Sequence, residues 1–280
     1  LPRYNIYPHM RAGGVLLIIA PPKHGKSFAA LEIAWSVSSG KPFLGLYDID
    51  VPGKVVYVAG EGAEETSGRI GARRQASGEN YPKRLGLYCH PIDLRDQAAC
   101  KAFVAWCRPL EVGCVIFDTV SRCGGGKEDA EDMTKLVHGA TYINQELGAS
   151  VVLLHHTPKD DKGSSRGHTS LPAAVDAQWI MDKTKGGIYS IVNSFTRSAE
   201  EDEEPIACFQ VENVVLGTNE DGREVGFGCA SPCATPDKKA RETPAEKAKR
   251  LVEETGSIRG AARRLKVDEK TVRNRLKGAE

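Results

Sequence analysis

Residues 20–28, APPKHGKSF, are the stretch whose residue types and order point most directly to chemistry. They follow an apolar run and open a segment with helical periodicity, so the loop aims backbone N–H groups and the positive end of a helix dipole at an anion. The lysine of such a loop reaches the β- and γ-phosphates of a nucleotide, and the serine after it takes a place on Mg²⁺. We predict ATP and Mg²⁺ as cofactors, bound by Pro21, Pro22, Lys23, His24, Gly25, Lys26, Ser27 and Phe28.

This loop departs from the usual eight-residue pattern at its first position, where Ala20 replaces a glycine. That glycine serves mainly the geometry of the turn, so alanine is tolerated as long as its φ angle stays negative. Gly25, directly before the lysine, is harder to replace, and it is present. We therefore expect the loop to hold phosphate.

Two carboxylates follow apolar runs further along the chain. Asp118 ends the run CVIFDT, where the metal-binding carboxylate of a nucleotide site lies, and we predict that it holds Mg²⁺ together with Ser27. Glu61 ends the run KVVYVAG and stands between two glycines, which let a substrate approach the backbone. We predict that Glu61 is the general base that activates water for hydrolysis.

Two adjacent histidines, His155 and His156, end the run SVVLLHH. They fall at the carboxyl edge of the predicted sheet, where ligands gather in open α/β folds. This position favours a sensor of the γ-phosphate or a link to a bound partner. Adjacent strand residues point to opposite faces, which argues against a shared metal ion.

Short apolar runs alternate with helical patterns along most of the chain, an order that predicts an α/β fold with a mainly parallel sheet. The predicted strands are 15–20, 54–60, 85–90, 114–119 and 150–156, and the predicted helices are 26–38, 63–77, 94–107 and 128–147. After residue 170 the runs AQWIMD, IYSIVNSF and IACFQVENVVL alternate apolar and polar residues without helices between them. They predict an antiparallel extension of the sheet.

The charge of the chain is unevenly distributed. Its net charge is only +1, but residues 237–280 hold 14 Lys and Arg against 8 Asp and Glu, so the rest of the chain is acidic. Such an asymmetry is expected of an appended nucleic-acid module, although a solvated basic helix pair gives the same pattern. The eight cysteines form no CxxC pair, and no apolar run reaches the length of a membrane helix. These features predict a cytoplasmic protein that makes no contact with a membrane.

The motifs together resemble the RecA-like ATPases of the plasmid replication helicase RepA and related phage and plasmid proteins. The resemblance covers roughly residues 1–220 and rests on several stretches in order: APPKHGKS, YVAGEG, VIFDTVSRCGGGKEDAEDM, GASVVLLHHTPKD, SSRGHTSLPAAVD and VENVVLGTNEDG. It implies a RecA-like P-loop NTPase core that forms a ring, usually a homo-hexamer, with ATP between subunits and single-stranded DNA in the centre. It also implies catalytic roles for Lys26, Asp118 and Glu61, and it places His156 at the sensor position.

The same resemblance implies a cation that reaches the ATP of the neighbouring subunit. Relatives often carry a Lys-x-Arg/Lys-Asp pattern on a late strand, whereas this chain reads FTRS and keeps only Arg197. Arg197 is therefore our first choice, and Arg166 is the second. Single-stranded DNA is expected at the loops after the fourth and fifth strands, chiefly at Lys159, Lys162 and Arg166.

The basic tail resembles a helix-turn-helix of the recombinase or Fis-like kind. Thr243 and Glu246 form a capping box around Pro244, which predicts a helix ending at Gly256, and two shorter helices follow. The last helix would lie in the major groove of duplex DNA. Its predicted DNA-binding residues are Lys270, Thr271, Arg273 and Asn274. A basic helical bundle that contacts proteins is the alternative.

The sequence thus predicts an ATPase core at 1–220, a linker at 221–243 and a small all-α helix-turn-helix domain at 244–280. The expected function is that of an ATP-dependent DNA helicase or translocase that moves on single-stranded DNA during phage or plasmid replication. A second possibility belongs to another class, namely a DNA-binding regulator or assembly factor that ATP switches and that does not unwind DNA.

Overall fold

The structure is a computed structural model that describes residues 2–60, 62–119, 130–156, 175–184, 186–197, 204–235 and 244–265, with residues 269, 272, 273 and 276 of the tail. The chain divides into two compact units, one that ends at Thr235 and one that runs from Pro236 to Glu280. Each unit is described by itself. No helix among the described residues is long and apolar enough to span a membrane.

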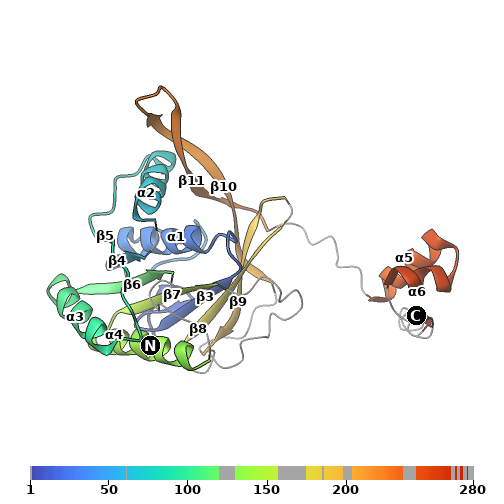
Figure 1. Cartoon of the computed structure of the whole chain (residues 1–280), viewed down its shortest axis with the longest axis horizontal. Coiled ribbons are helices and arrows are strands. Elements are labelled where there is room, and N and C mark those ends of the chain that lie inside the picture. Colours follow the sequence, from blue (N-terminus) through green and yellow to red (C-terminus); the bar gives the residue numbers. More distant parts are fainter. Residues whose placement is uncertain are drawn as a thin grey trace. The chain divides into compact units, whose positions relative to one another are not determined.

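The first unit is built on one sheet, in which nine described strands lie in the order β11-β10-β9-β8-β3-β7-β6-β4-β5 (Figure 1). Strands β3 to β8 run parallel to one another, and β9 to β11 continue the sheet from β8 with antiparallel pairs. The strands are β3 (Val15–Ala20), β4 (Lys54–Ala59), β5 (Leu85–Tyr88), β6 (Val112–Asp118), β7 (Ser150–His156), β8 (Ala177–Lys183), β9 (Tyr189–Thr196), β10 (Pro205–Thr218) and β11 (Glu224–Cys233). A separate pair, β1 (Tyr4–Ile6) and β2 (Met10–Arg11), precedes them.

Helices cover both faces of this sheet. Helices α1 (Lys26–Ser39) and α2 (Ala63–Ser77) lie on one face, and α3 (Gln97–Cys107) and α4 (Ala130–Leu147) lie on the other (Figure 1). A short 3₁₀ turn, Arg108–Leu110, joins α3 to β6. The inner strands read as continuous apolar runs because a parallel strand between two helical layers is buried on both sides.

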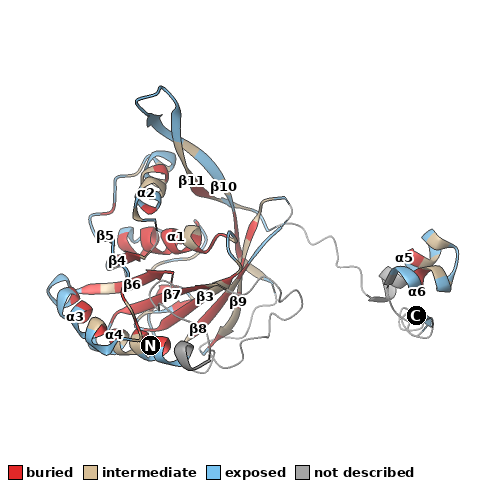
Figure 2. Ribbon diagram, viewed as in Figure 1, coloured by how far each residue is buried: buried red, intermediate tan, exposed pale blue. Residues whose placement is uncertain are grey.

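Strand β3 shows how the two hydrophobic clusters divide. Leu16 and Ile18 pack in the cluster that contains α1, whereas Val15 and Leu17 pack in the cluster that contains α3 and α4. This alternation follows from the period of two along a strand. Figure 2 shows the central strands and much of α1 as buried. The phosphate-binding loop therefore begins from a strand that is buried on both faces.

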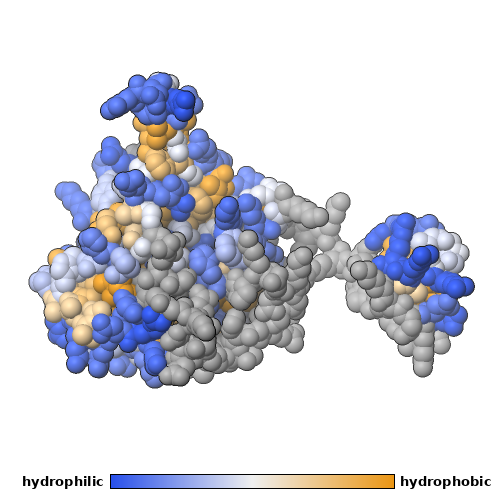
Figure 3. Space-filling model, in the orientation of Figure 1, coloured by the Kyte–Doolittle hydropathy of each residue, from blue (hydrophilic) through white to orange (hydrophobic). Residues whose placement is uncertain are grey.

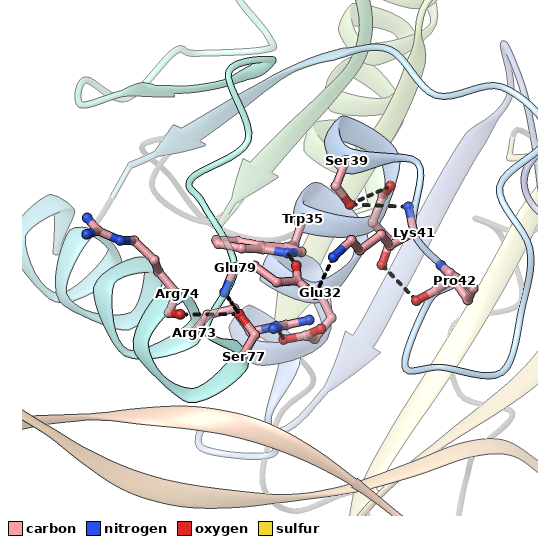
Figure 4. Close-up of polar contacts among 10 residues, drawn as sticks. Glu32, Trp35, Ser39, Lys41, Pro42, Arg73, Arg74, Ser77 and Glu79 are labelled. Atoms are coloured by element: carbon pink, nitrogen blue, oxygen red, sulfur yellow. Dashed lines mark hydrogen bonds and ion pairs between the residues drawn. The ribbon is translucent and has the colours of Figure 1, made fainter.

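Helix α2 is tied to α1 by a polar network (Figure 4). The Arg73 Nε donates to Glu32 Oε1 at 2.8 Å, and the Arg73 guanidinium lies over the Trp35 ring, 5.0 Å from its centroid. The buried Trp35 Nε1 donates to Glu79 Oε2 at 2.8 Å, just beyond the end of α2. Burial raises the pKa of the Glu32 carboxyl, and Arg73 opposes that rise. The network fixes the position of α2 beside α1.

The β10–β11 hairpin packs against α2 and extends beyond the body of the sheet (Figure 1). A Cβ atom at Gly68 of α2 would lie only 2.3 Å from the Phe227 ring of β11, so only glycine allows this close approach. Near the tip, Val215, Leu216 and Val225 are partly exposed, and Figure 3 shows an apolar band below a hydrophilic tip. The hairpin and α2 thus interlock through side-chain packing.

Most predicted elements agree with the structure, and helix 63–77 agrees at both ends. Two predictions are wrong. The run AQWIMD, expected in the antiparallel extension, forms β8, which pairs parallel with β3, so the antiparallel part begins at β9. The linker predicted at 221–243 contains β11, and the first unit continues to Thr235. Its start at residue 221 therefore has to be corrected.

The second unit contains α5 (Pro244–Thr255) and α6 (Ile258–Leu265). Ser257 Oγ accepts the backbone N–H of Gly260 at 3.0 Å, as a residue that caps α6 does. Leu251, Ala261, Ala262 and Val272 are buried and form a small core of their own. The described residues of the tail therefore have an apolar centre of their own.

Candidate nucleotide site

The phosphate-binding loop leaves the end of β3 and enters α1. Ala20 is the last residue of β3, pairs with His156 of β7 and is buried, so it occupies an ordinary strand position. The Lys26 side chain is 4% exposed. Its Nζ donates to the carbonyl oxygens of Ala20 at 2.7 Å and Pro21 at 2.9 Å, and it lies 2.9 Å from His156 Nδ1. The loop therefore folds around the lysine ammonium.

Gly25 is required at this point for two reasons. It begins α1 with φ 85°, a left-handed conformation that side chains disfavour. A Cβ atom at this position would also lie 2.6 Å from the Tyr189 ring of β9. The Tyr189 ring stacks in turn on Phe209, with centroids 5.2 Å apart. The antiparallel part of the sheet therefore supports the phosphate-binding loop directly.

Asp118 lies at the carboxyl end of β6 and is 7% exposed. Its Oδ2 accepts the Tyr57 hydroxyl at 2.5 Å, and its carboxylate accepts the Ser27 hydroxyl. Burial raises the pKa of the Asp118 carboxyl, and the hydrogen bonds from Tyr57 and Ser27, with the charges of Arg69 and Lys26, oppose that rise. A carboxylate and a hydroxyl in contact are the oxygen ligands that Mg²⁺ prefers, so this pair fits the predicted metal site.

Tyr57 is a residue of β4 whose side chain is fully buried, and its hydroxyl orients the Asp118 carboxylate. We expect Tyr57→Phe to raise the Mg²⁺ concentration needed for half-maximal ATP hydrolysis about tenfold, since the loss of a group that orients a metal ligand typically costs 10–100-fold. Titration of Mg²⁺ at saturating ATP measures the effect. Tyr81→Phe is the matched control, because its hydroxyl donates to the Leu85 carbonyl at 2.6 Å and its hydrogen bond does not involve Asp118. An unchanged Mg²⁺ requirement in Tyr57→Phe contradicts this role.

The buried ammonium of Lys26 predicts a pH dependence. Burial lowers its pKa from 10.5 to about 8, and the Asp118 carboxylate opposes that change. Between these two values the unfolded chain holds the proton and the folded chain releases it, so the stability of the nucleotide-free protein rises with pH. Phosphate binding needs the ammonium, so ATP affinity falls above pH 8 by up to about tenfold per pH unit. Calorimetric titrations across this range test both trends, and Lys26→Met is expected to show neither. A constant ATP affinity above pH 8 overturns the prediction.

The structure brings some of the predicted residues together and separates others. Lys26, Ser27, Asp118 and His156 meet at the carboxyl edge of the sheet. The neighbouring His155 is buried, in agreement with the opposite directions of adjacent strand residues. The following predicted residues lie outside the described part of the chain: Glu61, Lys159, Lys162, Arg166, Lys270, Thr271 and Asn274.

Arg197 lies at the other edge of the sheet. Its backbone N–H donates to the carbonyl of Asp176 at 3.0 Å, and its Nε donates to the Val175 carbonyl at 3.1 Å. Asp176 Oδ2 accepts the N–H of Val15, the first residue of β3, at 2.8 Å. Because the phosphate-binding loop follows the last residue of β3, Arg197 is one strand length away from the phosphate site of the same chain.

Three residues of this site were not predicted from the sequence. Tyr57 and Tyr189 resemble ordinary core residues of strands, and Arg69 resembles a solvated residue of a helix. The available signal was weak: a tyrosine in a fully buried strand needs a partner for its hydroxyl. Arg69 bears on the site through its charge, which acts on both Asp118 and Tyr57.

Comparison with known proteins agrees with this geometry. Residues 2–162, more than half of the chain, match the family model described as AAA domain. The chain is similar to a KaiC-like protein from the hyperthermophilic archaeon Pyrococcus horikoshii OT3, with a TM-score of 0.51, 12% identity, and coverage of 80% of this chain and 93% of that one. It is also similar to the RadB recombinase, with a TM-score of 0.49, 17% identity, and coverage of 72% and 88%. With its mostly parallel sheet and phosphate-binding loop, the chain belongs to the AAA domain family and is an ATPase with the RecA-like P-loop fold.

Proposed function

We propose that this ATPase is a DNA helicase or translocase of the RepA type, which hydrolyses ATP at the subunit interfaces of a ring and moves on single-stranded DNA. One observation carries the proposal. Strands β6 and β7 end at Asp118 and His156, beside the phosphate-binding loop, and the segments expected to contact single-stranded DNA, 121–132 and 157–170, follow these strands in the sequence. The segments proposed to contact DNA would therefore begin just after Asp118 and His156, the two residues beside the bound phosphates.

The proposed hydrolysis follows from residues at this edge. Lys26 binds the β- and γ-phosphates with its ammonium, and Ser27 and Asp118 hold Mg²⁺, which neutralises charge on the phosphates. Glu61 removes a proton from the attacking water. The residue before it, Gly60, donates its N–H to the Asp118 carbonyl at 2.8 Å, and α2 begins two residues after Glu61. The chain around Glu61 is thus attached to the metal-binding strand.

A ring also supplies the cation that stabilises charge in the transition state. The place of Arg197, at the edge of the sheet opposite its own phosphate site, supports a role toward a neighbouring subunit. Arg166 is the second candidate for this role. We propose a homo-hexamer, and mixing Glu61→Gln subunits with Arg197→Ala or Arg166→Ala subunits tests action in trans. Restored hydrolysis in one mixture identifies the arginine.

For the tail we propose a helix-turn-helix that binds duplex DNA. Its separate apolar core and its basic charge support the proposal. Arg273 is exposed and forms an ion pair with Glu269 at 3.4 Å, so its side chain lies at the surface of the tail. Gel-shift assays with the tail included or removed, at several salt concentrations, measure its contribution.

Two assays separate the helicase from the ATP-switched regulator. The first compares ATP hydrolysis with and without single-stranded DNA, and the second measures displacement of one strand from a forked duplex. Stimulated hydrolysis with strand displacement supports the helicase, and Lys26→Ala serves as the inactive control. Hydrolysis without displacement removes the helicase proposal and leaves a switch whose nucleotide state sets assembly or DNA binding.

A further inference from the structure

Arg69 is a charged residue of α2 whose surroundings differ from those of an ordinary surface arginine. Its side chain is 22% exposed, and its Nη2 donates to Glu65 Oε1 at 3.0 Å, one turn earlier on the helix. The other contact is with an aromatic ring, because the guanidinium carbon lies 4.6 Å from the centroid of Phe28. One end of the guanidinium therefore faces the helix surface, and the other points inward.

The part of the Arg69 guanidinium that points inward carries a donor, Nε, without a partner among the described residues. Arg69 Nε is buried and has no hydrogen-bond acceptor within the described residues. A buried donor on a charged group costs free energy when it is left unpaired, and such groups in folded proteins are rare. The Phe28 ring stabilises the charge through its face, but it accepts no ordinary hydrogen bond from Nε. An acceptor beyond the described residues accounts for this donor.

The neighbours of Arg69 indicate which acceptor this is. Phe28 directly follows Ser27 in the first turn of α1, so Arg69 lies beside the helix end that faces the phosphates. Arg69 also acts electrostatically on the Asp118 carboxylate and on the Tyr57 hydroxyl. Arg69 is thus a second cation beside the phosphate-binding loop of its own subunit, and it comes from the helix that follows Glu61.

We propose that Arg69 is a catalytic residue that donates a hydrogen bond from Nε to a phosphate oxygen of the ATP bound in its own subunit. The Phe28 ring holds the guanidinium in place, and α2 carries it next to the proposed general base. Charge that develops on the transferred phosphoryl group is then shared between Lys26 and Arg69, which are both present before the reaction begins. The inference rests on nucleotide hydrolysis at this loop and does not depend on helicase activity.

The first experiment is steady-state ATP hydrolysis at saturating Mg²⁺. We expect Arg69→Ala to lower kcat/KM about 100-fold, the usual effect of removing one donor that stabilises transition-state charge. Arg69→Lys keeps the charge but lacks Nε and the planar fork, so we expect it to keep less than about a tenth of the wild-type value. Full activity in Arg69→Lys overturns the role of Nε.

Two controls separate phosphate binding from a structural role. Arg74→Ala removes an exposed arginine of the same helix and is expected to stay within about twofold of wild type, as surface substitutions do. Glu65→Gln removes the ion-pair partner but leaves the guanidinium over Phe28, so we expect activity near that of wild type. A loss in Glu65→Gln equal to that in Arg69→Ala shows that the ion pair matters and overturns the proposal.

Binding measurements make the result independent of turnover. Calorimetry with a non-hydrolysable ATP analogue, ADP and AMP is expected to show weaker binding of the first two ligands to Arg69→Ala and unchanged binding of AMP. Equal affinities of wild type and variant for all three ligands, together with unchanged hydrolysis, overturn the inference. If the wild-type protein binds nucleotide but displaces no DNA strand, the helicase proposal fails while the role of Arg69 stands.

Discussion

We expect Lys26→Ala to lower kcat/KM for ATP at least about 100-fold, because the variant lacks the cation that binds the phosphates. The lysine ammonium is buried among two carbonyl oxygens and the His156 ring. A phosphate is a stronger partner for the ammonium than these groups, because its oxygens carry negative charge that attracts the ammonium directly. Binding of ATP therefore draws the ammonium to the phosphates, and alanine has nothing to replace it.

The measurement is hydrolysis together with nucleotide affinity. Lys54→Ala is the control, because Lys54 forms only an exposed pair with Glu111 at 3.6 Å at the start of β4. A surface pair of this kind contributes at most about 1 kcal/mol to the stability of the fold. Lys54 lies at the start of β4, whereas the end of this strand pairs with Asp118 at the phosphate site. Hydrolysis by Lys26→Ala at more than about a tenth of the wild-type rate would show that the loop is not the catalytic site.

The second large effect is expected for Glu61→Gln. If Glu61 is the general base, the amide cannot accept the proton of water, and kcat falls roughly 1000-fold, within the range usual for such groups. Nucleotide affinity stays close to wild type because the glutamate acts on water and the phosphates are held by other residues. Single-turnover hydrolysis measures the loss of the chemical step, and equilibrium binding of ATP measures whether the affinity is unchanged.

Glu64→Gln, an exposed residue in the first turn of α2, controls for the loss of a negative charge near the site. It is expected to hydrolyse ATP like the wild type. A Glu61→Gln variant that binds ATP ten times more weakly, or that hydrolyses it at a near-normal rate, requires another general base.

The elements that carry the nucleotide site were predictable because their signals are local. An apolar run long enough for a buried strand, followed by a turn with Pro21, Pro22 and Gly25 and then a helical period, predicts β3, the loop and α1 from local signals. Asp118 was predictable for the same reason, since it ends such a run. Helix α2 was predicted at both ends because its apolar period is bounded by Gly62 and Gly78.

The remaining parts depend on contacts between distant segments. Strand β11 was predicted as part of a linker because Gly226, Gly228 and Pro232 are residues typical of turns. Its pairing with β10 is visible only when the two strands lie side by side. Arg69 was overlooked because its ion pair with Glu65 is the usual pattern of a solvated helix face. Its inward donor is a property of the packing of α2 on α1.

The interlock between Gly68 and Phe227 has a consequence for communication within the molecule. Because the Phe227 ring occupies the space where a side chain at residue 68 would lie, the hairpin cannot shift without displacing α2. The same helix begins directly after the proposed general base. By thermodynamic reciprocity, any ligand of the hairpin that favours one position of α2 changes ATP affinity, and ATP changes the affinity for that ligand by the same factor. The packing of the hairpin on α2 therefore offers a route by which binding at the hairpin would be coupled to binding of the nucleotide.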